Sequence, residues 1–486
     1  MILDRKAMAR VAPMRTSRWF HCPKEFTCLL LGVIGLLGVI HLHADPVTLA
    51  DPFNLLKQSE ILGDGFGYRQ KASDHGVVLT AQWTSDLFGN TTGGAATGTT
   101  YSGLLNLGLA VDLQKAVGWE EASFKCTWLW LYGTDVSARY IGNALTASGV
   151  AGSPGFRCYE LWFQQNFLND TISLRGGMLG VDTEFMISDT ANLFINSTFG
   201  PPAFFTLNMP NGGPTYPLAT PGLRLALQPT SWLTIRSVIA QANPFSQQEN
   251  AQGFNWNFGP AGGLLSLSEV ATAWNQSSSA NALPGTAKAG FWIQTGEDQE
   301  AAQESSVDDS FHFGSPEARA YGSGFYGIID QQLYDATDKV SSTPGNGSSK
   351  NPLSADKNPQ SATSPSTFSG EGLSSFARLG FSPQPWSQVG FYSDAGLVYT
   401  GLVPTRDADK LGVAFGYAQM GSQYASLGTS AGLPGVGYEA VAELSYAMQL
   451  SPAISIQPDL QYILHPGGTQ QYGNALVVGM RAAVNF

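Results

Sequence analysis

Charged side chains are scarce in this sequence. Asp, Glu, Lys and Arg together make up 13% of its 486 residues, against roughly 25% in soluble domains. Glycine occurs 56 times, and aromatic residues contribute 11%. A surface built from this composition cannot be a charged one, which argues against an ordinary soluble protein and suggests surroundings other than water.

Long apolar runs are lacking as well. After residue 44 no run reaches the roughly 20 residues that a membrane-spanning helix needs. The run CLLLGVIGLLGVI, residues 28–40, has 13 residues, follows a basic segment and precedes HLHADP. This pattern predicts a secretory signal peptide, residues 1–44, that is cleaved after Ala44. An exported chain of this kind crosses a membrane with strands if it crosses one at all.

Cysteine and histidine are too few for most site chemistry. The mature chain keeps Cys126 and Cys158, which strand alternation places on opposite faces and therefore not in one disulfide. Its histidines, His75, His312 and His465, have neither the spacing of zinc ligands nor a defensible serine partner. We therefore expect no metal, no cofactor and no catalysis.

The charge balance and the remaining motifs exclude further classes. A formal net charge of −12 makes nucleic acid an improbable partner. The glycine-rich GDGFG at residues 63–67 precedes any strand, so it does not fit a dinucleotide loop. The acidic stretch 297–317 has seven carboxylates and no Lys or Arg. It fits a solvated loop better than a calcium site, although both stay open.

Alternating apolar residues are what the chain has in abundance. Leu105, Leu107 and Leu109 oppose Asn106 and Gly108, as expected for a strand with one apolar face. The same pattern predicts sixteen strands, at residues 76–88, 101–114, 122–132, 156–167, 171–179, 218–228, 231–241, 262–272, 286–295, 323–334, 373–381, 387–399, 409–419, 437–449, 453–464 and 474–486.

The connections between these strands alternate in length. Long ones at 89–100, 133–155, 180–217 and 242–261 are separated by short ones at 115–121, 168–170 and 229–230. That rhythm is typical of an all-β, 16-stranded antiparallel outer-membrane barrel, with a periplasmic, partly helical segment at 45–75 and the barrel at 76–486. The insertion 341–370 falls on the normally short side. Periodicity alone does not exclude a secreted β-sandwich binding protein, which would purify without detergent.

The last twelve residues, ALVVGMRAAVNF, form an alternating strand that closes on Phe486. A terminal aromatic residue of this kind resembles the signal that the barrel assembly machinery recognises in outer-membrane proteins. Phe486 would then face lipid in the periplasmic aromatic girdle.

Several segments in one order resemble the carbohydrate-selective (OprB-type) porins: LGDGFGYRQKASDHGVVLTAQWTSDLFGNTTGG near the start, LFINSTFGPP from Leu193, YPLATPGLRLALQPTSWLTIRSVIAQANP, GFYGIIDQQLY, DADKLGVAFGYAQM and IQPDLQYILHPGG. The resemblance implies a monomeric 16-stranded porin in the outer membrane of a Gram-negative bacterium that passes small sugars without energy input. The stretch 297–317 and the insertion 341–370 depart from the family pattern.

Alternation also assigns charged side chains to the lumen, independently of the resemblance. Three successive strands each direct an arginine inward, and other strands direct inward further charged groups; the arginines are Arg175, Arg224 and Arg236, and the others are Glu160, Asp112, Arg378, Asp394 and Glu443. Guanidinium groups can replace the water around sugar hydroxyls and focus the field of a narrow pore. The arginines can equally pair with the carboxylates, and both roles fit one side chain.

The loop 180–217 is the best candidate to fold into the lumen and narrow it, with Asp182 and Glu184 near its start. An ordinary external loop is the alternative. Other rivals are a barrel-embedded hydrolase, which needs a paired Ser and His, and the secreted β-sandwich.

Overall fold

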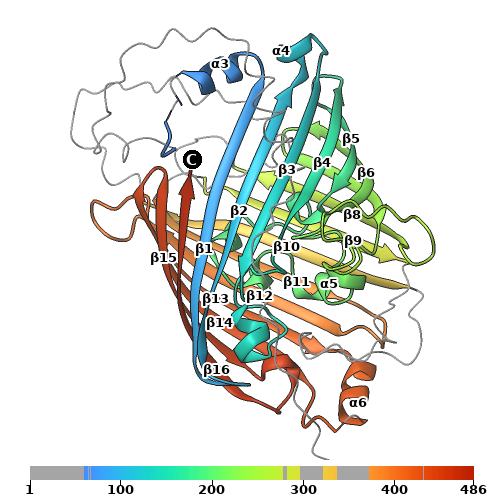
Figure 1. Ribbon diagram of the computed structural model, residues 1–486, viewed down its shortest axis with the longest axis vertical. Helices are drawn as coiled ribbons and strands as arrows, with labels where there is room; N and C mark the ends of the chain where they lie inside the picture. The colour runs from blue at the N-terminus through green and yellow to red at the C-terminus, as the bar shows by residue number, and fades with distance from the viewer. Residues whose placement is uncertain are drawn as a thin grey trace, which may run out of the picture. The chain divides into compact units, whose positions relative to one another are not determined.

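The computed structural model describes residues 60–63, 65, 67–276, 282–295, 321–336, 371–430 and 432–486, and within them the chain forms a closed barrel of sixteen strands (Figure 1). The predicted signal peptide, most of the segment 45–75, the acidic stretch 297–317 and the insertion 341–370 lie outside the described residues.

The strands follow one another around the barrel in chain order. They are β1 Val77–Gly94, β2 Gly98–Asp112, β3 Ala122–Gly133, β4 Gly155–Phe167, β5 Ile172–Leu179, β6 Thr220–Thr230, β7 Leu233–Gln241, β8 Leu264–Trp274, β9 Gly285–Gln294, β10 Gly322–Asp335, β11 Gly372–Phe381, β12 Val389–Thr400, β13 Lys410–Met420, β14 Tyr438–Ser451, β15 Ile454–Leu464 and β16 Gly473–Asn485. Each strand pairs antiparallel with its neighbours, and β1 closes on β16 with Gln82 opposite Asn485. The predicted sixteen-stranded barrel is confirmed, and the β-sandwich alternative is wrong.

Short helices lie at the strand ends and in the loops: α3 Tyr68–Asp74, α4 Leu113–Val117, α5 Ala203–Thr206 and α6 Ser422–Ser430, with one π-helical turn at Ser137–Ile141. Asp112, expected to point into the lumen, instead caps α4 by accepting the N–H groups of Gln114 and Lys115. Gly118 ends α4 with a φ of 77°, a conformation that favours glycine. No helix in the described ranges is long and apolar enough to cross a membrane.

The predicted strand ends agree with the structure to within a few residues, except at the first hairpin. β1 continues to Gly94 because its upper half pairs with both β2 and β16. The connection predicted at 89–100 is therefore only residues 95–97. Three long loops on this side are fully described: L2 (residues 134–154), L3 (residues 180–219) and L4 (residues 242–263).

Side chains alternate between the outer and inner face of the wall as predicted. Leu223 and Leu225 on β6 are 54% and 41% exposed, whereas Arg224 between them is 1% exposed. The outer face of β16 carries Val478 and Met480, and the same alternation places Phe486 outward. At the end of the chain the N–H of Phe486 donates to the carbonyl of Ala81 on β1.

The expectation that Cys126 and Cys158 face opposite ways is wrong. The β3–β4 register shifts after Thr127–Glu160 to Trp128–Cys158, which makes Tyr159 an extra residue in a β-bulge. The bulge turns Cys158 to the outer face that Cys126 shares with Trp128. The two thiols are within hydrogen-bonding reach, and both are free.

Candidate functional site: the lumen and the loops inside it

L3 lies inside the barrel, in agreement with the prediction that it narrows the lumen. Its helix α5 packs against β12 (Figure 1). The ring of Phe204 lies 6.1 Å from that of Tyr392, and the ring of Phe205 lies 5.5 Å from that of Trp292. The wall leaves room for these rings, since a Cβ on Gly380 would lie 2.3 Å from Phe204 Cδ1. One side of the lumen is therefore a packed apolar core.

Buried carboxylates of the wall hold L3 by accepting its hydrogen bonds. Glu443 accepts from Ile195 N (2.6 Å) and Asn196 N (2.9 Å), Asp330 from Ser188 Oγ (2.6 Å) and Thr190 N (3.1 Å), and Glu269 from Met186 N (3.0 Å). Glu443 therefore fixes the loop and does not stand free in the lumen.

L2 is held in the same way, which the sequence analysis did not predict. Glu439 on β14 accepts the N–H groups of Ala144 (2.8 Å) and Leu145 (2.7 Å). Ser148 Oγ donates to Asp86 Oδ2 (2.6 Å) on β1. Asp86 in turn accepts from Nε and Nη2 of Arg481, at 2.8 and 2.7 Å.

Arg378 and Asp394 form a second, separate anchor of L3. They face each other across β11 and β12, with Arg378 Nη2 2.5 Å from Asp394 Oδ2. Arg378 also donates to the carbonyls of Gly200 (2.6 Å) and Thr198 (2.8 Å) in L3. Tyr392 donates to the same carboxylate at 2.6 Å. This pair is fully buried, so it positions the loop.

The three predicted arginines converge on Glu184 of L3. Arg224 binds both its oxygens, with Nε 2.8 Å from Oε2 and Nη2 3.0 Å from Oε1. Arg175 Nη1 lies 3.3 Å from Oε1, and Arg236 donates to the Glu184 carbonyl at 3.1 Å while pairing with Glu269 at 3.3 Å. Burial alone would raise the pKa of Glu184, but the three guanidinium groups outweigh it and hold the pKa at about 2.

A polar and aromatic wall continues this cluster on β3 and β4. Glu160 pairs with Lys125 Nζ at 3.0 Å. The guanidinium of Arg175 stacks on the ring of Trp162, 3.8 Å from its centroid. Asp182 accepts from Tyr159 Oη (2.5 Å), and burial raises the pKa of this loop carboxyl to about 6.

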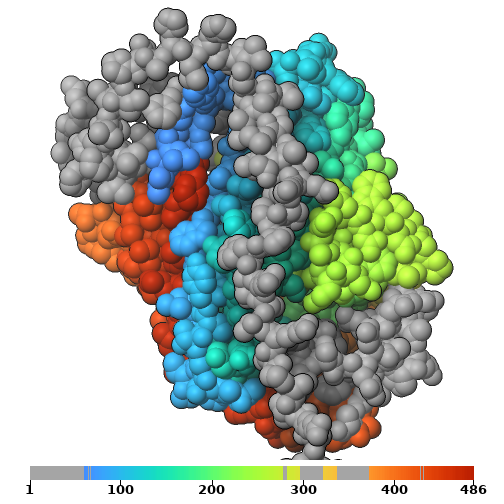
Figure 2. Space-filling model, viewed as in Figure 1, coloured from blue at the N-terminus to red at the C-terminus, as the bar shows by residue number. Residues whose placement is uncertain are grey.

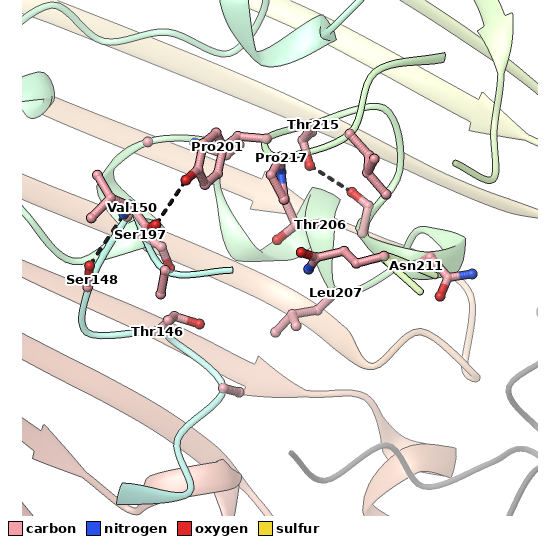
Figure 3. Close-up of a pocket in the computed structure, with 18 of the residues that line it drawn as sticks. Thr146, Ser148, Val150, Ser197, Pro201, Thr206, Leu207, Asn211, Thr215 and Pro217 are labelled. Carbon is pink, nitrogen blue, oxygen red and sulfur yellow. Dashed lines mark hydrogen bonds between the residues drawn. The ribbon is translucent and has the colours of Figure 1, made fainter. Parts of the chain in front are cut away.

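A large cavity lies among the extracellular loops. This cavity of about 500 Å³ is lined by residues of L2, L3 and L4, with Gln388, Tyr424 and Arg481 from other parts of the barrel. Figure 3 shows Thr146 and Ser148 of L2 on one side and Thr206, Asn211 and Thr215 of L3 on the other. The cavity beside Arg175, Arg224 and Glu184 holds about 10 Å³, roughly the space of one water.

The structure thus divides the predicted site residues into three groups. Glu160, Arg175, Asp182, Glu184, Arg224 and Arg236 lie together near the base of L3. Arg378 pairs with Asp394 on another part of the wall, and Glu443 lies with Asp459 on β14 and β15. The three arginines pair with Glu184 and Glu269, whereas Asp394 pairs with Arg378 and Glu443 accepts from Ile195 and Asn196.

Glu269, Asp330, Glu439 and Lys125 were not predicted as site residues. Strand alternation could have identified Glu439, since it lies four residues before Glu443 on the same face of β14. Glu269 was not, because Leu265 and Leu267 point inward with it against L3. Apolar alternation assigns such residues to the lipid face.

No cluster of three or more His, Cys, Asp or Glu side chains in the part of the chain that the structure describes is arranged to hold a metal ion. His465 lies in a loop, with its ring 4.5 Å from that of Tyr438.

Comparison with known proteins decides the family. The model of the carbohydrate-selective porin, OprB family, matches residues 96–486. The chain belongs to the OprB family. The protein is thus an outer-membrane channel for carbohydrates, and its family and fold point to a channel rather than an enzyme.

Relatives support this assignment over nearly the full length. Porin B of Pseudomonas aeruginosa is 24% identical over 94% of this chain and 97% of its own. QuiX of Acinetobacter baylyi is 26% identical over 93% and 99%. The high-pH structure of Pseudomonas putida OprB superposes with a TM-score of 0.71 at 22% identity, over 88% of this chain and 99% of that one, which shows the same fold.

Proposed function

We propose that small uncharged sugars diffuse passively through this OprB-family barrel by way of the cavity between L2, L3 and L4. The observation that carries the proposal is that cavity, whose volume of about 500 Å³ falls in the range of about 300–1,000 Å³ typical of small-ligand sites. Its lining is rich in hydroxyl and amide groups, which exchange hydrogen bonds with sugar hydroxyls without selecting a charge.

The sugar then passes the side chains that remain accessible below the cavity. Lys125 and Arg481 are each 19% exposed, and Glu184 and Arg175 are 10% and 7% exposed. Arg224, Arg236 and Arg378 are at most 2% exposed. The first group contacts solute in this proposal, and the second group keeps L3 in place.

Three partners complete the proposal. Lipid covers the apolar outer wall of the barrel. The barrel assembly machinery recognises Phe486 at the end of β16. The barrel works as a monomer, as the resemblance to the OprB family implies.

Liposome swelling with a series of mono-, di- and trisaccharides tests this function. Swelling should be fast for monosaccharides and fall steeply with size, without any energy source. Leu225→Ala, a change on the lipid face, should give the same series as the native protein. Correctly folded protein that passes no sugar faster than empty liposomes would overturn the proposal.

A further inference from the structure

The barrel wall has a notch above β5. The β4–β5 register begins only at Leu161–Met178, so the extracellular part of β4, from Gly155 to Glu160, has no β5 partner on that edge. β5 is short because the chain leaves the wall at residue 180 to enter the lumen as L3. An open strand edge at this height would expose backbone polar groups to lipid, which is costly.

L4 occupies the notch. The carbonyl of Gln252 accepts the N–H of Cys158 on the open edge at 3.0 Å. Gln247 Oε1 accepts from Ser153 N (2.8 Å) and Arg157 Nη1 (3.0 Å) on the lumen side. Gly253 has a φ of +81°, and a Cβ there would lie 1.9 Å from the Cys158 carbonyl oxygen. L4 therefore sits directly against β4, and glycine is required at the contact.

The next residues of L4, GFNWNFG at 253–259, alternate like a wall strand. The N–H groups of Gly253, Asn255, Asn257 and Gly259 all donate to acceptors at residues 241–257, at 2.8 to 3.0 Å. The intervening aromatic side chains are turned away, with Phe254 44%, Trp256 58% and Phe258 63% exposed. Four of the seven N–H groups of this segment are thus satisfied within the protein, as hydrocarbon surroundings favour for an irregular segment.

These aromatics continue the outer face of the barrel. The ring of Phe254 lies 5.9 Å from Trp128, which stacks on Phe156 at 5.4 Å. Trp128 lies five residues before the end of β3. With a rise of about 3.3 Å per residue and a tilt of about 40°, it lies roughly 12 Å below the extracellular rim, inside an apolar band about 25 Å tall. In Figure 1 this loop is the yellow-green connection beside β8, and Figure 2 shows the same colour at the right edge.

We propose that residues 253–259 form a lipid-facing patch of the barrel wall, with Phe254, Trp256 and Phe258 embedded in the acyl chains of the outer leaflet. The segment closes the wall where L3 has left it. Lipid is the occupant because the patch continues the surface of Trp128 and Phe156, which already faces the membrane. This proposal does not depend on which solute passes the lumen.

The test uses the full-length protein in liposomes whose lipids carry bromine on the acyl chains. The fluorescence of Trp256 is obtained as the difference between the native protein and Trp256→Phe, a change that keeps an aromatic ring. Trp130, 52% exposed on the lipid face of β3, gives the positive control as Trp130→Phe, and the enclosed Trp292 gives the negative control as Trp292→Phe.

The Trp256 component should lose fluorescence with brominated lipid to the same extent as the Trp130 component, and should resist iodide added to the water. Quenching by iodide and not by brominated lipid would overturn the proposal. So would resistance to both quenchers together with a doubled mass in detergent, which would assign the patch to a second copy of the chain. Gly253→Val should displace L4 from β4. In this variant the Trp256 fluorescence should be quenched by iodide and no longer by brominated lipid.

Discussion

Replacing Glu184 by Gln removes the carboxylate that Arg175 and Arg224 contact and whose charge Arg236 also stabilises. Lowering the pKa from 4.5 to about 2 means that the surroundings favour the charged form by about 3 kcal/mol. That contribution is fully present above pH 4.5 and is lost only as the pH falls through about 2, so it operates at neutral pH. It agrees with the roughly 3–5 kcal/mol that breaking a buried ion pair costs.

Glu184→Gln should therefore change both charge and mobility at the base of L3. The lumen gains one uncompensated positive charge beside Arg175. The reversal potential in a salt gradient should therefore shift in the direction of greater anion preference. The loosened loop should add fluctuations to the single-channel current in planar bilayers. Arg175→Ala should move the reversal potential the opposite way and weaken the saturation of sugar flux, because it removes the accessible cation.

Leu223→Ala, on the lipid face of the same region, is the matched control and should change neither property. The diagnostic result is that Glu184→Gln and Arg175→Ala shift the reversal potential in opposite directions. If Glu184→Gln and Arg175→Ala both give the reversal potential of Leu223→Ala, the Glu184 cluster does not border the conducting path.

Four further outcomes are expected. Because the pKa of Asp182 is about 6, cation preference should rise as the pH increases through 6, and Asp182→Asn should abolish that rise in reversal-potential measurements. Glu443→Gln weakens two backbone hydrogen bonds of L3, worth about 0.5–1.5 kcal/mol each, and should admit larger sugars in swelling assays. Deleting Phe486 should lower the amount of barrel in the outer membrane more than the conductance of each assembled channel, whereas equal amounts would contradict the signal role. N-terminal sequencing of outer-membrane material should begin at Asp45, and an intact leader on folded protein would refute the predicted cleavage.

The wall of this barrel was predictable from sequence because alternation is a local property. Three consecutive residues, Leu223, Arg224 and Leu225, are enough to assign each side chain to the outer or inner face. The assignment fails at β8 and at Cys158, each for its own reason. At β8 it fails because L3 gives the lumen an apolar lining, so Leu265 and Leu267 point inward. At Cys158 it fails because one bulged residue reverses the face of everything beyond it.

The contents of the lumen were harder to predict because they depend on contacts distant in sequence. The length of L3 indicated that it enters the barrel, but not that Glu184 of the loop would neutralise Arg224 of the wall. L2 has the length of an ordinary external loop, and Glu439, which holds it, lies almost 300 residues away. Alternation placed the arginines on the inner face. Which of them contacts solute and which anchors L3 depends on the residues they pair with, and those lie far away in the sequence.

Single-channel ion current during a sugar titration tests most directly whether sugar occupies and crosses the cavity between L2, L3 and L4. A monosaccharide added on the loop side should lower the current in a saturable way, and Glu184→Gln should alter the sugar concentration that gives half of that effect. Current that is independent of sugar up to its solubility limit, in native channels of normal conductance, would contradict this proposal.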